Sequence, residues 1–144
     1  MNIFSLMTPK SLTFYLSTKF TLRQAIEKME YHKYSVIPVI DEDGKFVESI
    51  SEGDILRFFK TNNGIIDLSE TEKIEVNQIE KFKPYKALRV DAEFDEMVEL
   101  SLVQNFIPII DDRGIFIGIV RRSAIIKELK RIAMGDEDGK SKEE

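Results

Sequence analysis

A ten-residue segment occurs twice in this chain, at positions 70 residues apart. Residues 38–47 (PVIDEDGKFV) align without gaps on residues 108–117 (PIIDDRGIFI). Each copy consists of an apolar run, an acidic stretch with one glycine, and a second apolar run. Glycine adopts a positive φ at little cost and aspartate favours turns, so each copy predicts two antiparallel strands joined by a tight turn. Such a repeat predicts a chain of two similar units.

The segments on either side of the two hairpins also correspond. Upstream of each hairpin, apolar residues recur at helical spacing, and Thr21 is a favourable N-cap for the first of these helices. Downstream, residues 54–59 and 124–129 predict matching amphipathic helices. A short strand is expected at the start of each copy, at residues 12–15 and 87–90. Each copy therefore predicts the order β-α-β-β-α, in the α/β (α+β) class.

These correspondences divide the chain into four parts. We expect a first repeat over residues 1–60, a connector over 61–75, a second repeat over 76–132 and a mobile acidic tail over 133–144. The connector is rich in Asn, Gly, Ser and Glu, which favour loops. Residues 136–144 hold five acidic and two basic residues, which account for three of the five excess negative charges of the chain.

The two copies differ in the length of one helix. Eighteen positions separate Phe20 from Pro38, but only 14 separate Phe94 from Pro108. At 3.6 residues per turn, the first helix of the second copy is expected to be about one turn shorter. The second copy is therefore expected to lack counterparts of the residues in that turn of the first copy, which are Tyr31, His32, Lys33 and Tyr34.

Composition excludes several functional classes. Hydrophobic residues make up 42% of the 144 residues and charged residues 33%, an ordinary balance for a folded soluble chain. A basic stripe for nucleic acid is missing, and no apolar run approaches the roughly 18 residues that a membrane helix needs. With no cysteine and a single histidine, thiolate and His-based metal sites are not expected. No nucleophile and base can be paired, so we expect a protein that is not an enzyme and requires no cofactor. With no cysteine and no basic segment followed by an apolar stretch at the N-terminus, we expect it in the cytoplasm.

The chain resembles the CBS domain family, whose members pair as tandem copies in a Bateman module. The resemblance covers about residues 3 to 131, and it is carried by Leu6-Met7-Thr8-Pro9, the helix after Thr21, YSVIPVID at 34–41, Gly44, and SEGDIL at 51–56. It implies two β-α-β-β-α repeats packed through their sheets about a pseudo-twofold axis, with two clefts between them. Family members commonly bind AMP, ADP, ATP or S-adenosylmethionine there, as regulatory sensors. They also commonly form homodimers, and the sequence does not identify a regulated protein partner.

Ser51 and Asp54 match the family's Thr/Ser-x-x-Asp ribose motif. An ionised aspartate accepts hydrogen bonds from both hydroxyls of a cis-diol, and a serine hydroxyl donates or accepts. The same spacing ahead of an apolar helix is also a capping box, which satisfies free helix N–H groups without any ligand. Both interpretations stay open, and both can hold at one helix N-terminus.

The resemblance places the base of the ligand against Thr13, Ser35, Ile37 and Pro38. An apolar wall formed by Ile37 and Pro38 suits an adenine ring, and Thr13 matches the family position whose backbone frames the base. The alternative is that these residues simply begin a buried strand, where β-branched side chains are favoured.

The second copy departs from the ribose motif. Its counterparts of Ser51 and Asp54 are Arg121 and Ala124, so we do not expect the second cleft to hold ribose in the family manner. Arg121 and the adjacent Arg122 instead place two cations near the cleft mouth, where they are expected to face phosphates bound in the first cleft. The alternative is that both arginines pair with surface carboxylates, Glu52 or Asp111.

The first copy also departs from the family, because Glu48 stands where the second copy has Gly118. A missing Cβ allows a backbone or ligand to approach closely, and a carboxylate beside the cleft repels phosphates. Glu48 therefore favours a ligand of low negative charge, or none.

Two functions follow: a regulatory sensor that binds an adenosine-containing ligand in one inter-repeat cleft, or a ligand-free dimerisation or partner-docking module with degenerate sites.

Overall fold

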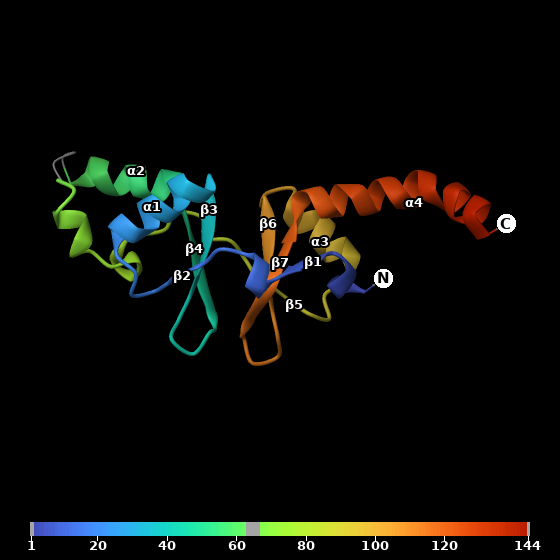
Figure 1. Ribbon diagram of the computed structural model, residues 1–144, viewed down its shortest axis with the longest axis horizontal. Coiled ribbons are helices and arrows are strands. Elements are labelled where there is room, and N and C mark those ends of the chain that lie inside the picture. Colours follow the sequence, from blue (N-terminus) through green and yellow to red (C-terminus); the bar gives the residue numbers. More distant parts are fainter. Residues whose placement is uncertain (1, 63–66, 144) are drawn as a thin grey trace.

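The computed structural model describes residues 2–62 and 67–143, with side chains as far as residue 135. Its first repeat contains a three-stranded sheet of order β2-β3-β4 with two helices packed on it (Figure 1). Strand β2 runs parallel to β3, and β3 runs antiparallel to β4. The elements are β2 (Leu16–Ser17), α1 (Leu22–His32), β3 (Val36–Ile40), β4 (Phe46–Ser51) and α2 (Glu52–Thr61).

The second repeat has the same order of elements and the same strand pairing. Its elements are β5 (Leu88–Arg89), α3 (Phe94–Ser101), β6 (Phe106–Ile110), β7 (Phe116–Arg121) and α4 (Arg122–Glu143). The predicted β-α-β-β-α order is therefore confirmed in both copies. Helix α1 has 11 residues and α3 has 8, which confirms the predicted loss of about one turn.

One strand crosses from the first repeat to the second. Strand β1 (Met7–Pro9) pairs antiparallel with β7, so the sheet of the second repeat has four strands in the order β1-β7-β6-β5. This pairing places Pro9 opposite Gly118, where a Cβ would stand 2.4 Å from the carbonyl oxygen of Thr8. Glycine is thus required at 118 by the crossing strand. Its counterpart Glu48 lies on β4, the outer strand of its sheet, where a side chain is tolerated.

The strand expected at residues 12–15 is displaced. Residues Lys10–Leu12 form a 3-10 turn, η2, and the strand begins at Leu16. Leu12 is 68% exposed, whereas Leu16 is fully buried opposite Val39. Strand pairing therefore starts where the chain enters the core. Three further 3-10 turns are η1 (Ile3–Ser5), η3 (Glu70–Glu72) and η4 (Val76–Gln78).

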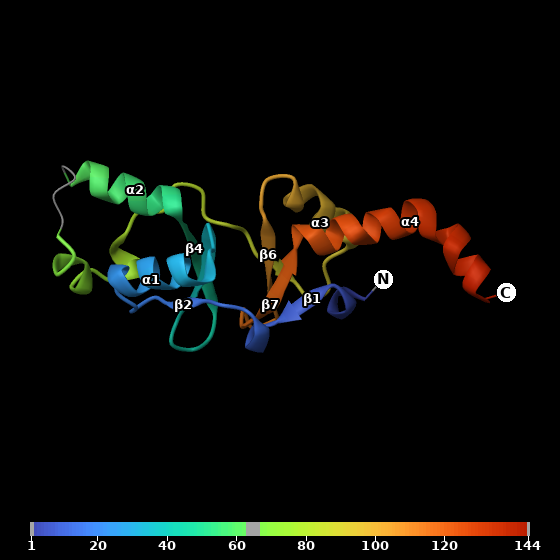
Figure 2. The ribbon, with the colours of Figure 1, turned by 45° about the horizontal axis from the view of Figure 1, so that its top comes forward.

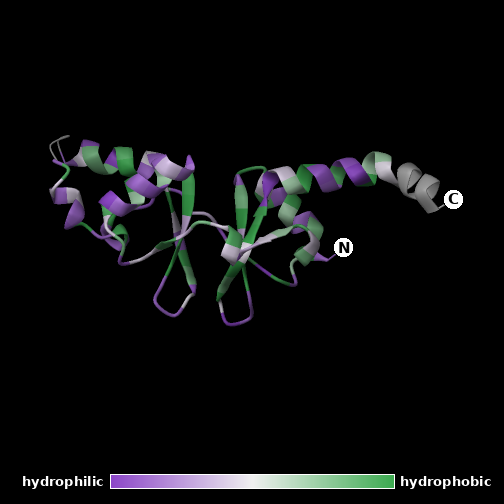
Figure 3. Ribbon diagram, viewed as in Figure 1, coloured by the Kyte–Doolittle hydropathy of each residue, from purple (hydrophilic) through white to green (hydrophobic). Residues whose placement is uncertain are grey.

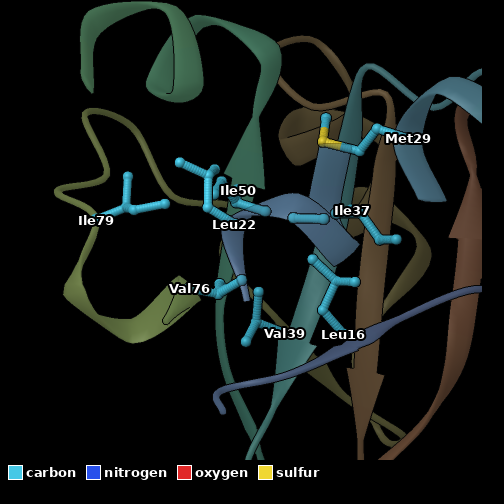
Figure 4. Close-up of a cluster of buried hydrophobic side chains, with 9 residues drawn as sticks. Leu16, Leu22, Met29, Ile37, Val39, Ile50, Val76 and Ile79 are labelled. Carbon is cyan, nitrogen blue, oxygen red and sulfur yellow. The ribbon is translucent and has the colours of Figure 1, made fainter. Parts of the chain in front are cut away.

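Figure 4 shows the core of the first repeat, which includes two residues that were expected to belong to the second. Val76 and Ile79 are buried there beside Leu22 and Ile50. The backbone N–H of Leu22 donates to Ile74 at 2.7 Å, and that of Val76 donates to Phe20 at 2.8 Å. The packing of the first repeat therefore extends past the expected start of the second at residue 76. Connector residues 63–66 lie outside the described residues.

The two repeats pack through their sheets, and apolar strand residues gather at the centre of the molecule (Figure 3). At their turns, the two hairpins exchange backbone hydrogen bonds, from Phe46 to Gly114 at 3.1 Å and from Phe116 to Gly44 at 2.9 Å. Gly44 and Gly114 have φ values of 84° and 85°, which glycine adopts without strain. These two reciprocal hydrogen bonds relate the repeats by a pseudo-twofold axis.

Helix α4 breaks the symmetry between the two repeats. It extends well beyond the second sheet, away from the other repeat (Figure 2). The helix continues to Glu143, so the residues expected to form a mobile tail from 133 onward belong to α4, except residue 144, which lies outside the described residues. Within the described ranges, no helix combines the length and the apolar character needed to cross a bilayer.

Candidate ligand-binding site

Equivalent backbone contacts mark the two clefts between the repeats. The carbonyl of Ser35 accepts the N–H of Glu52, and the carbonyl of Asn105 accepts the N–H of Arg122, both at 2.9 Å. Each contact joins the start of a core strand to the start of the helix that follows the hairpin. The residues around these two points correspond by the 70-residue offset. A cleft between the repeats at one of these contacts therefore has a pseudo-symmetric counterpart at the other contact.

One of these clefts, which we call the open cleft, is a pocket of about 300 Å³. This volume is at the lower end of the range for small-molecule sites. The first repeat supplies the start of β3 and the end of α1, and the second supplies the starts of β6 and α4. The lining residues are Phe14, Lys33, Tyr34, Ser35, Val36, Pro38, Asn105, Phe106, Ile119, Arg121 and Ser123.

Two cations line the open cleft, and the described lining includes no Asp or Glu. Lys33 is the C-cap of α1, with φ of 57° in the left-handed region, so the longer helix of the first copy brings it here. Arg121 ends β7. In the part of the chain that the structure describes, neither residue has an ion-pair partner. The open cleft is therefore electropositive.

Aromatic rings form one wall of the open cleft. The Phe14 ring stacks on the His32 imidazole, with centroids 3.4 Å apart and planes at 20°. The Phe14 and Tyr34 rings form a T-shaped pair, with centroids 5.6 Å apart. His32 and Tyr34 come from the turn that the second repeat lacks. Among the described residues, this aromatic wall is supplied by the first repeat.

Three of the predicted site residues, Ser35, Pro38 and Arg121, line the open cleft. Ile37 does not, because alternate residues of β3 face opposite ways and Ile37 is fully buried in the first core. Thr13 is also buried, and its hydroxyl donates to the carbonyl of Lys10 at 2.9 Å, so its neighbour Phe14 lines the cleft instead.

Arg122 takes a structural role outside the open cleft. Its Nε donates to the carbonyl of Ser101 at 2.8 Å, which ties the start of α4 to the end of α3. Asp111, one of the two carboxylates expected as partners for Arg121 and Arg122, pairs instead with Arg113 at 3.2 Å. The surface ion pairs suggested for Arg121 and Arg122 do not form among the described residues.

Ser51 and Asp54 form a capping box and do not line the open cleft. The Ser51 hydroxyl accepts from the Asp54 N–H at 3.1 Å, and Asp54 Oδ2 accepts from the Ser51 N–H at 2.8 Å. Asp54 Oδ1 accepts from Arg57 at 2.7 Å and from the Phe82 N–H at 3.0 Å. Asp54 is 2% exposed, and both of its carboxylate oxygens accept hydrogen bonds from the protein's own groups.

The pseudo-symmetric counterpart, which we call the filled cleft, is occupied by Tyr85. The Tyr85 N–H donates to the Ser49 hydroxyl at 2.6 Å, and the Tyr85 hydroxyl accepts from the Asn105 N–H at 3.0 Å. Its ring contacts Phe106 edge-on, with centroids 4.9 Å apart. Ser49, Asn105 and Phe106 correspond by the 70-residue offset to Ile119, Ser35 and Val36 of the open cleft. The chain itself thus takes the place of a ligand on this side.

Glu48 lies outside the lining of the open cleft and forms an ion pair with Lys81. Its carboxylate pairs with Lys81 at 2.9 Å, and the two side chains are only 20% and 5% exposed. The Lys81 ammonium also donates to the carbonyl of Val76. The charge of Glu48 is thereby balanced by Lys81, and Glu48 does not line the open cleft.

Several lining residues were not predicted: Phe14, Lys33, Tyr34, Asn105 and Ser123. The sequence held a signal for some of them. Asn105 is the offset counterpart of Ser35, so the repeat alignment pointed to it once Ser35 was chosen. Ser123 is the counterpart of Gly53, which lies between the two predicted site residues Ser51 and Asp54. Within the described ranges, no group of three His, Asp or Glu residues is placed to hold a metal ion.

Comparisons with known proteins agree with this architecture. The uncharacterized protein MJ1426 of Methanocaldococcus jannaschii is 28% identical over 135 residues, which covers 75% of this chain and 80% of the relative. The CbpB protein of Listeria monocytogenes, solved in complex with c-di-AMP, superposes with a TM-score of 0.76 at 22% identity, over 90% of this chain and 95% of that one. CBSX2, a CBS-pair protein of Arabidopsis thaliana, was solved in complex with AMP, and this structure superposes with a TM-score of 0.69 at 21% identity, over 92% of this chain and 98% of that one.

The family assignment rests on sequence and fold together. The profile of the CBS domain family matches residues 3–61 and 79–131, which is most of the chain. The two matched segments coincide with the two β-α-β-β-α units. The chain belongs to the CBS domain family, as a tandem pair of CBS domains.

Proposed function

We propose that this chain is a regulatory module that binds an adenosine-containing ligand in the open cleft. The observation that carries the proposal is that both repeats line this pocket, with an aromatic wall on one side and cations nearby. A ligand held between two packed units biases their relative arrangement whenever its affinity differs between arrangements. The module therefore acts as a sensor and not as a catalyst.

The chemistry of the lining suits an adenine nucleotide. Adenine stacks on aromatic rings, and Phe14 and Tyr34 offer such faces beside the apolar Pro38. Arginine binds phosphate with a planar pair of donors, which Arg121 supplies. Support for the ligand class comes from CbpB and CBSX2, which were solved with c-di-AMP and AMP.

Calorimetry with AMP, ADP, ATP, c-di-AMP and S-adenosylmethionine tests the proposal. At least one of these ligands is expected to bind with one site per chain. Phe14→Ala removes the stacking face and is expected to weaken binding about tenfold or more. Leu12→Ala is the control, because Leu12 is a 68% exposed neighbour outside the pocket. Failure of all five ligands to bind at millimolar concentration would overturn the proposal.

A second candidate is a dimerisation or partner-docking module that needs no ligand. It is favoured by the filled cleft and by exposed apolar residues on the outer helices, where Leu56, Ile126 and Leu129 are 74%, 57% and 41% exposed. Sedimentation velocity separates the two functions. The docking module predicts a homodimer whose dissociation constant is insensitive to nucleotide and rises when Ile126 is replaced by Ser.

A further inference from the structure

We infer that the open cleft recognises its nucleotide through the base and the phosphate, and does not read the vicinal diol of the sugar. This inference rests on the proposed function and specifies its ligand class. Nucleotides without a free 2′,3′-diol, such as 2′-deoxynucleotides and cyclic phosphodiesters, belong to that class together with ordinary ribonucleotides.

The second repeat supplies the part of the open cleft that corresponds in sequence to the ribose motif. Arg121 and Ser123 line the pocket, and they are the offset counterparts of Ser51 and Gly53. The motif that faces the open cleft is therefore that of the second repeat. Its final position is Ala124, which has no side-chain acceptor.

The described lining of the open cleft lacks the acceptor that a vicinal diol needs. Two adjacent hydroxyls are held best by a carboxylate, which accepts a hydrogen bond from each of them. The described lining of the open cleft contains no carboxylate. Asp54, which has the matching position in the first repeat, is 2% exposed and bonded to Ser51, Arg57 and Phe82. Tyr85 occupies the cleft on that side, so Asp54 cannot serve the open one.

In place of a carboxylate, the open cleft offers cations and hydroxyl groups. Lys33 and Arg121 place positive charge on its lining, with the hydroxyls of Ser35 and Ser123 nearby. Helix α4 begins at this pocket with Arg122 and has no acidic residue in its first turn, although the positive end of a helix dipole favours one. Helix α2, in contrast, has Glu52 and Asp54 in its first turn. The family motif places an anionic side chain at this position. The open cleft has positive charge there instead, and therefore favours an anionic group on the ligand.

The experiment compares AMP, 2′-deoxy-AMP and adenosine by calorimetry. We expect AMP and 2′-deoxy-AMP to bind within about threefold of each other, and adenosine to bind at least about tenfold more weakly. The difference between AMP and adenosine is expected to shrink as salt is raised. A tenfold loss for 2′-deoxy-AMP, or equal affinity for adenosine and AMP, would overturn the inference while leaving the proposed function intact. If AMP, 2′-deoxy-AMP and adenosine all fail to bind, the inference is overturned, and the proposed function is overturned with it only if ADP, ATP, c-di-AMP and S-adenosylmethionine fail as well.

A charge-removing variant assigns the effect to the open cleft. Arg121→Met is expected to weaken AMP and 2′-deoxy-AMP by the same factor, about tenfold or more, and to leave adenosine unchanged. Arg89→Met is the matched control, because Arg89 is 58% exposed on β5 and does not line the pocket. An equal loss for adenosine in Arg121→Met would show that Arg121 does not act on the phosphate, and would overturn the inference.

Discussion

Asp54 Oδ1 accepts a hydrogen bond from the backbone N–H of Phe82 at 3.0 Å, across 28 residues of sequence. The same oxygen accepts from Arg57, whose guanidinium lies 4.7 Å from the centre of the Phe82 ring. The carboxylate thereby ties the chain that leaves the first repeat to the start of α2. A residue expected to hold a ligand instead fixes the course of the segment between the repeats.

Asp54→Ala is therefore expected to act on stability and not on ligand affinity. It leaves the N–H groups of Ser51 and Phe82 without their acceptor, at a cost of about 2 kcal/mol in the free energy of unfolding. Urea unfolding measures this loss, and calorimetry with AMP measures the affinity. Asp54→Asn keeps one acceptor oxygen and is expected to lose less. Loss of AMP binding with unchanged stability would contradict this role.

Tyr85 limits the chain to one ligand. Because its ring and hydroxyl occupy the filled cleft, calorimetry is expected to give a stoichiometry of one per chain. Tyr85→Phe keeps the ring but removes the acceptor for the Asn105 N–H, and is expected to cost about 1 kcal/mol in unfolding. A stoichiometry of two in the unmodified chain would contradict the assignment of a filled cleft.

Gly118→Ala is expected to loosen the crossing strand β1. Its Cβ would lie 2.4 Å from the carbonyl oxygen of Thr8, so the strand must shift, at about 1–3 kcal/mol in the free energy of unfolding. Gly53→Ala is the control, because its Cβ meets the nearest side-chain atom at 3.6 Å and alanine suits a helix. Faster amide exchange at Met7 and Thr8 of β1 in the first variant alone is the expected signature. Equal stabilities of the two variants would argue against the close approach.

Removing one member of the Glu48–Lys81 pair is expected to cost more than removing both. Lys81→Met leaves the Glu48 carboxylate largely buried without its partner, at about 3 kcal/mol in the free energy of unfolding. The double variant Glu48→Gln, Lys81→Met is expected to recover part of that loss. A double-mutant cycle in urea measures the coupling, and additive effects would contradict the pairing.

The second hairpin turn is expected to weaken in acid. Partial burial raises the pKa of Asp111, but hydrogen bonds from the N–H groups of Ile115 and Arg113, and from the Arg113 side chain, outweigh it and lower the pKa below 3.8. A lowered pKa means that the folded state favours the ionised form. The resulting stability is present above pH 3.8 and is lost as the pH falls through the folded-state pKa.

Unfolding of the native chain and of Asp111→Ala between pH 7 and pH 2 measures this effect. The difference in unfolding free energy is expected to stay constant above about pH 5 and to shrink below pH 3.8. Asp112→Ala is the control, because Asp112 is exposed in the same turn. A difference that grows in acid would contradict the assignment.

Local patterns in the sequence were sufficient for most of the fold. The repeated hairpin, the Thr21 cap and the shorter α3 could all be predicted, because turns, caps and helical periodicity are encoded within a few neighbouring residues. The capping interpretation of Ser51 and Asp54 was available for the same reason. The strand expected at 12–15 was misplaced because its exact start depends on where Leu16 meets Val39 in the core.

The sequence by itself determined two β-α-β-β-α repeats of unequal helix length, and with them the CBS architecture. Only the tertiary structure decided which cleft is open. The contacts that decide it join residues far apart along the chain: Phe82 with Asp54, Tyr85 with Ser49, and β1 with β7. Such pairs depend on how two sheets and a connecting segment pack in space, and no short-range pattern specifies that packing.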